Sequence, residues 1–79
     1  MAHALENAQR PTAHFVITEY AQLQGPADAI NAGAVAVVEF ESDQHLLRRG
    51  VDFLSGLAYG TRAAFDRLDS HVYRLIPAD

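Results

Sequence analysis

The residue types able to do chemistry are present in this chain of 79 residues, but their spacing matches no catalytic or metal site. The four histidines do not fall at ligand spacing along a helix, and there is no cysteine, so we expect no metal site and no cofactor. Ser55 lacks a nucleophile-elbow pattern, and nothing indicates that His45 orients it. Glu39, Glu41 and Asp43 cluster, but a solvated loop explains them better than acid–base chemistry. We therefore predict a protein without enzymatic activity.

Composition bounds the remaining functions. The formal net charge of −4 argues against nonspecific nucleic-acid binding. No apolar run approaches the roughly 18 residues of a membrane span, and the first residues resemble no signal peptide, so we expect a cytoplasmic protein. A single domain of this size buries only about 60–65% of its unfolded surface, and oligomerisation is the obvious route to further burial.

The longest predicted element is a helix over residues 42–60. Ser42 and Asp43 suit its first turn, because a side-chain oxygen can accept from the free backbone N–H groups there. Gly60 suits a left-handed stop. Two neighbouring apolar stripes run along this helix, giving it a wider apolar face than one small sheet needs to cover. They are Leu47, Val51, Leu54 and Ala58, and Leu46, Gly50, Phe53 and Leu57.

Glycines inside this helix indicate close approach by another backbone. Gly50 and Gly56 each cost about 1 kcal/mol of helix stability relative to Ala. An ordinary core helix is one interpretation. The sharper one is a helix that also packs against a partner subunit, with Gly50, Phe53, Gly56 and Leu57 at the interface.

The other elements complete a two-layer α/β sandwich. After a flexible lead-in over residues 1–12, the domain of residues 13–79 has the order β-α-β-α-β-β, with two helices on one face of a four-stranded mixed sheet. Pro26 disturbs the first helix, so its regular part is expected to begin near Gly25, and Gly33 closes it. Besides the long helix, we expect strands over 13–20, 34–40, 63–68 and 71–76 and a helix over 21–32.

The register of the final hairpin decides which side chains share a face. A two-residue turn at Asp69-Ser70 would place Asp66 opposite Tyr73. A three-residue loop over 69–71 pairs Asp66 with Arg74, Arg67 with Tyr73, and Leu68 with Val72. We favour the second register, because Asp-Ser is a poor type I′ turn and the opposite charges then face each other. It places Phe65, Arg67, Tyr73 and Leu75 on one face.

Residues 50–60, Gly-Val-Asp-Phe-Leu-Ser-Gly-Leu-Ala-Tyr-Gly, resemble the most distinctive helix of the SepF family of bacterial cell-division proteins. Segments 65–68 and 72–77 are similar to that family's two following strands. Segments 27–33 and 34–38 are similar to its earlier helix, glycine and buried strand. The resemblance covers about residues 14–77.

This resemblance implies the same sandwich and a homodimer or higher oligomer that binds the C-terminal tail of FtsZ at the division site. In the family, a cation on the first hairpin strand and an aromatic on the second help hold that tail. These positions are Arg67 and Tyr73 here, and Phe65 shares their face. Unlike the family, this chain shows neither an amphipathic membrane helix nor a long linker before the core, so we expect no direct membrane anchor in it.

Two alternatives remain. A SepF-like paralogue would pair with another SepF-type protein without holding FtsZ. A small-molecule-sensing domain would place a polar-lined pocket at a dimer seam. The surplus of apolar surface on the long helix and on the strand over 34–40 favours an interaction role in either case.

Overall fold

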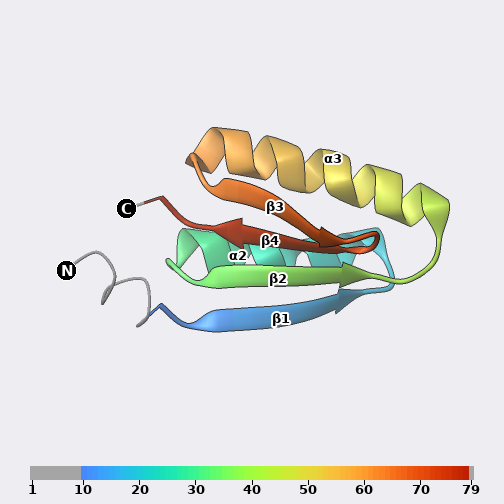
Figure 1. The fold of residues 1–79 in the computed structure, drawn as a ribbon, viewed down its shortest axis with the longest axis horizontal. Coiled ribbons are helices and arrows are strands. Elements are labelled where there is room, and N and C mark those ends of the chain that lie inside the picture. The colour runs from blue at the N-terminus through green and yellow to red at the C-terminus, as the bar shows by residue number, and fades with distance from the viewer. Residues whose placement is uncertain (1–9, 79) are drawn as a thin grey trace.

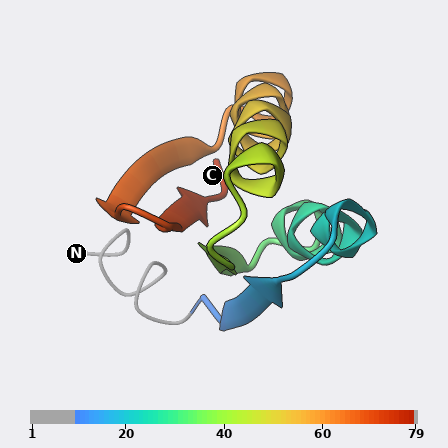
Figure 2. The same cartoon turned by 90° about the vertical axis from the view of Figure 1, so that its right-hand side faces the viewer.

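The computed structural model describes residues 10–78, which form a two-layer sandwich. The sheet has the strand order β1-β2-β4-β3, with β1 parallel to β2 and the other neighbours antiparallel. Both helices cover one face, and no helix of residues 10–78 covers the other (Figures 1 and 2). The predicted fold class is confirmed. The elements are β1 (Thr12–Ile17), the 3-10 helix η1 (Tyr20–Leu23), α2 (Gln24–Asn31), β2 (Val35–Phe40), α3 (Gln44–Thr61), β3 (Ala64–Asp69) and β4 (Val72–Ile76).

The core lies between the sheet and the helices. β2 is central, since it pairs with β1 on one side and β4 on the other. Its residues Ala36, Val38 and Phe40 alternate onto the helix side and are buried. Leu54 of α3 and Leu75 of β4 meet them there. No helix within residues 10–78 is long and apolar enough to cross a membrane.

The first strand ends earlier than its sequence suggests. The predicted strand over 13–20 is β1, which stops at Ile17, and Tyr20 belongs to η1. The cause is local: the Gln22 side-chain oxygen accepts from the backbone N–H groups of Thr18 and Glu19 and turns the chain. The lead-in over 1–12 lies outside the described residues except for its last three, and Thr12 already belongs to β1.

The helix predicted over residues 21–32 is split into η1 and α2. α2 begins at Gln24, close to the predicted start near Gly25, so that Pro26 falls in its first turn, where no intrahelical partner is needed. Gly33 follows the helix with a φ of 87°, which confirms it as the C-terminal glycine.

The ends of α3 agree with the sequence at one terminus only. Asp43 caps the start, where its carboxylate accepts from the N–H groups of His45 (2.9 Å) and Leu46 (3.2 Å). The prediction that Gly60 forms a left-handed stop is wrong. The helix runs through Gly60, and Arg62 takes the left-handed conformation with a φ of 62°.

The final hairpin has most of the favoured register. Asp66 pairs with Arg74 and Arg67 with Tyr73 as predicted, and the charged side chains of Asp66 and Arg74 form a 2.9 Å ion pair. The pairing of Leu68 with Val72 is wrong. A bulge between Arg67 and Asp69 shifts the register so that Asp69 faces Val72. The bulge gives β3 one residue more than β4 and leaves the turn at Ser70 and His71.

Candidate functional site

The predicted peptide-binding residues share one face of the hairpin. Phe65 lies opposite Leu75 and Arg67 opposite Tyr73, and directly opposed residues of an antiparallel pair point to the same side. That side carries the helices, because Leu75 and Tyr73 also face Ala36 and Val38 of β2. We call Phe65, Arg67 and Tyr73 the hairpin trio.

The aromatic members of the trio form a stack. The rings of Phe65 and Tyr73 are nearly parallel, with centroids 5.6 Å apart. The Tyr73 ring also meets Phe40 edge to face at 6.1 Å. Tyr73 is only 8% exposed and belongs to the core, whereas Phe65 is half-buried. A ligand on this face would therefore touch Phe65 more than Tyr73, and Tyr73 would fix the Phe65 ring in place.

Arg67 adds a cation to the same strand face, opposite Tyr73 in register. Its side chain is exposed, and its Nε donates to the Asp69 backbone oxygen at 3.3 Å. The terminal guanidinium nitrogens have no hydrogen-bond partner among residues 10–78. They can donate to a carboxylate in a two-point arrangement. The trio thus joins a planar cation to an aromatic surface.

The four predicted interface residues of α3 differ in exposure. Gly50 is buried inside the protomer, where a side chain would overlap the Phe40 ring. Phe53 and Leu57 are half-buried, and Gly56 is exposed with nothing within 4 Å of where its side chain would be. The expected approach of another backbone at Gly50 is wrong within the protomer, because the group that comes close is the Phe40 side chain of β2.

An aromatic cluster beside Phe53 escaped the sequence analysis. Tyr20 of η1 meets the Phe53 ring edge to face at 6.0 Å, and the Arg49 guanidinium lies 4.2 Å from the centroid of the Tyr20 ring. It was missed because Tyr20 was expected to end a strand. The spacing of Arg49 and Phe53, one helical turn apart, was the available signal.

The end of α3 also carries an unexpected feature. Tyr59 is 90% exposed on the side of the helix away from the sheet. It lines a shallow, open hollow with Ala58, Gly60, Arg62 and Ala63. In the sequence, the only sign of this exposed ring is that Tyr59 is an aromatic residue outside both apolar stripes of the helix.

The described residues assemble no metal or acid–base centre. Within residues 10–78, no group of three His, Asp or Glu side chains converges as metal ligands would. Ser70 Oγ lies 3.1 Å from His71 Nδ1, but the opposite ring nitrogen of His71 is buried and has no partner.

Comparison with solved structures agrees with the fold. The chain is similar to a SepF-like protein from Pyrococcus furiosus, with a TM-score of 0.78 and 20% sequence identity over 86% of this chain and 87% of that chain. At this identity the likeness establishes a SepF-like fold, as the sequence resemblance predicts. No protein-family model and no curated protein matches the sequence.

Proposed function

We propose that this chain is a non-enzymatic adaptor of cell division, which self-associates in the cytoplasm at the division site and binds the C-terminal tail of FtsZ. The observation that carries the proposal is the hairpin trio, in which Arg67 lies opposite Tyr73 on the strand face where the rings of Phe65 and Tyr73 stack. The SepF-like fold supports a role in division. No covalent step is required of any residue.

The trio suits an acidic peptide with an apolar anchor. The Arg67 guanidinium would pair with a carboxylate of the tail, and the half-buried face of Phe65 would receive an apolar side chain. Because Tyr73 is held between Phe65 and Phe40, its ring loses little freedom when a ligand arrives. We assign Arg67 to charge recognition, Phe65 to contact, and Tyr73 to positioning Phe65.

Self-association is assigned to the flank of α3 that carries Phe53, Gly56 and Leu57. Gly56 lies on the exposed side, with no neighbour where a side chain would be, so a second helix can approach its backbone. Phe53 and Leu57 supply apolar area beside it. Gly50 contributes indirectly, by letting α3 settle on Phe40.

The test is binding of a fluorescent FtsZ C-terminal peptide, followed by polarisation up to near-millimolar protein. Arg67→Glu is expected to weaken binding at least about tenfold, because a desolvated charge-assisted contact is worth more than about 1.4 kcal/mol. Arg48→Glu, on the exposed side of α3, is the matched control and should leave the affinity within about twofold. Light scattering should give the same mass for both variants.

Two negative outcomes of this binding test lead to different conclusions. Unaltered affinity in Arg67→Glu would contradict the assignment of the trio. No binding by the folded wild-type protein would contradict the FtsZ proposal and favour the paralogue, which co-purification with another SepF-type protein would then establish. A metabolite-dependent rise in melting temperature would instead favour the small-molecule sensor.

A further inference from the structure

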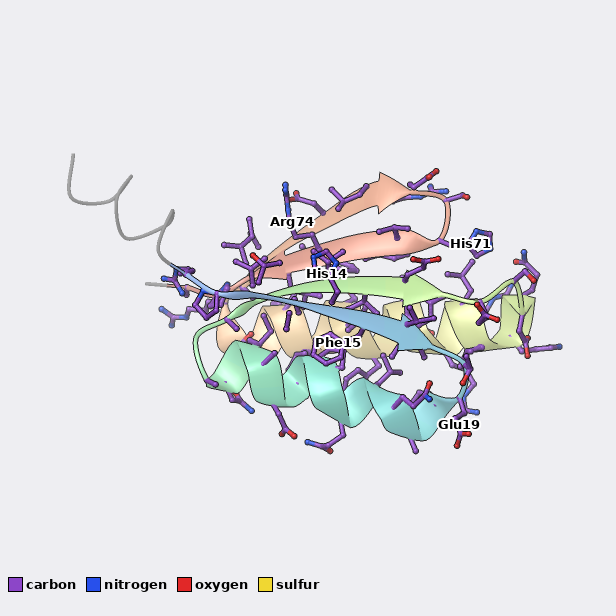
Figure 3. The ribbon with its side chains drawn as sticks, turned by 90° about the horizontal axis from the view of Figure 1, so that it is seen from below. His14, Phe15, Glu19, His71 and Arg74 are labelled. Atoms are coloured by element: carbon purple, nitrogen blue, oxygen red, sulfur yellow. The ribbon has the colours of Figure 1, made fainter. Side chains whose placement is uncertain are left out.

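The two edges of the sheet are built differently. Edge strand β3 carries Asp66, Arg67 and Asp69 and is interrupted by the bulge, which are features that discourage pairing with another strand. Edge strand β1 has neither feature. Its six residues pair with β2 without a break, and none of them is Asp, Glu, Lys or Arg. Figure 3 looks toward this edge.

The backbone hydrogen bonds identify the groups that face outward from β1. The oxygens of Pro11, just before β1, and of Ile17 accept from the N–H groups of Val35 and Glu41, so the backbone groups of the odd-numbered residues point toward β2. In a parallel ladder both backbone groups of a residue point the same way. The N–H and C=O groups of Thr12, His14 and Val16 therefore point away from β2. No strand among residues 10–78 pairs with them.

The set of outward-facing residues in β1 ends at Val16 and is centred on His14. The next outward N–H, that of Thr18, already donates to the Gln22 side chain. Thr12, His14 and Val16 thus form a set with His14 in the middle. An antiparallel partner satisfies all three residues when its own outward residues are spaced in the same way.

We propose that the β1 edge pairs antiparallel with the β1 edge of a second copy, around a two-fold axis at His14. Each His14 would face the partner's His14, and each Thr12 would face the partner's Val16. These positions are all hydrogen-bonded pairs, because every outward backbone group then meets a complementary one. In a register centred on another residue, the outward backbone groups of Thr12 or Val16 would have no hydrogen-bond partner. The result is one continuous sheet with all helices on the same side.

The side chains fit this register. Ala13 would lie opposite the partner's Phe15 on the helix side, a small residue against a large one. On the open side, Thr12 would meet Val16, which is 56% exposed in the single chain. A second copy fits better than an unrelated peptide, since both strands then present the same symmetrically spaced edge.

Cysteine cross-linking tests the register, because the chain has no cysteine of its own. His14→Cys should form a disulfide-linked dimer on mild oxidation, since hydrogen-bonded antiparallel partners have Cα atoms about 5.5 Å apart. Val16→Cys is the matched control and should remain unlinked, because the two copies of residue 16 would be roughly 13 Å apart. A mixture of Thr12→Cys and Val16→Cys should cross-link. Equal cross-linking of the two single variants, or none by His14→Cys, would overturn the proposal.

A backbone substitution tests the hydrogen bonds themselves. His14→Pro removes an outward N–H that β2 does not use, so the protomer should keep its fold, whereas self-association at this edge should weaken at least about tenfold. His14→Ala keeps the N–H and should associate within about threefold of wild type in sedimentation equilibrium. The same affinity for His14→Pro and wild type would overturn the proposal. Should His14→Pro unfold, the cross-linking result decides alone.

This edge is independent of the proposed FtsZ binding and of the α3 flank. Cross-linking by His14→Cys should persist in a Gly56→Lys background and without any peptide. Loss of cross-linking with intact peptide binding would contradict only the proposed pairing of two β1 strands.

Discussion

At the scale of single residues, Gly50 shows how one missing side chain sets the distance between two layers. The Phe40 ring occupies the space where a Cβ at residue 50 would be. The glycine therefore lets α3 approach β2 closely, although it weakens the isolated helix by about 1 kcal/mol. The sequence predicted a close approach by another backbone at this position. The group that approaches is instead the Phe40 side chain, which local sequence could not indicate because Phe40 and Gly50 belong to different elements.

We expect Gly50→Ala to lower the free energy of unfolding by about 1–2 kcal/mol. Overpacking costs about 1–3 kcal/mol, which outweighs the gain in helix propensity. Urea denaturation of the purified variant measures this. Gly56→Ala is the control and should raise stability by about 0.5–1 kcal/mol, because no atom lies near the added methyl group.

A second substitution shows whether Phe40 is responsible. Adding Phe40→Leu should make the Gly50→Ala change less costly, because the smaller side chain leaves room for the methyl group. Strict additivity of the two substitutions would mean that residue 50 is strained by some other contact.

At the scale of elements, the end of α3 separates what a local pattern predicts from what it does not. Apolar periodicity located the helices and strands to within a few residues. It favoured Gly60 as the stop, because glycine is the usual left-handed residue. Instead the helix continues, Thr61 donates to the Leu57 oxygen, and the N–H of Ala63 reaches the Ala58 oxygen beyond a left-handed Arg62. The start of β3 determines this end, and no local pattern contains it.

Arg62→Gly should therefore raise the free energy of unfolding by roughly 0.5–1 kcal/mol, because glycine relieves the left-handed strain but gains freedom in the unfolded chain. Gly60→Ala should also stabilise, by about 0.5 kcal/mol, since Gly60 is an exposed residue in the last turn of the helix, with no atom near the added methyl group. Thermal unfolding of both variants checks this. A destabilised Gly60→Ala would instead place the left-handed residue at position 60.

The final hairpin also shows which features local sequence patterns can predict and which they cannot. Opposite charges and turn chemistry were enough to predict the pairing of Asp66 with Arg74, and so the shared face of the trio. The bulge at Leu68 was beyond reach, because it depends on how the turn closes against β2, where the Phe40 N–H donates to the His71 oxygen. The depth of Tyr73 depends in the same way on Phe40 and Phe65.

At the scale of the whole molecule, the order of elements was predictable and the contacts between copies remain predictions. If the Gly56 flank of α3 packs against a second helix, Gly56→Lys should split that contact and leave the fold intact, since residue 56 is exposed in the single chain. Light scattering over a concentration series should show a lower mass. Ser55→Lys, exposed but turned away from the Phe53 flank, is the control and should keep the wild-type mass.

The unequal edges of the sheet carry a consequence for how far an assembly can grow. When two β1 strands pair about a two-fold axis, each satisfies the outward backbone groups of the other, so neither strand can pair with a third copy. The joined sheet then ends on both sides in β3, whose charges and bulge resist further addition. Strand pairing is thereby self-terminating, and any longer polymer must propagate through a different surface. A protein with this edge can form a dimer by strand pairing without growing into a fibre through the same edge.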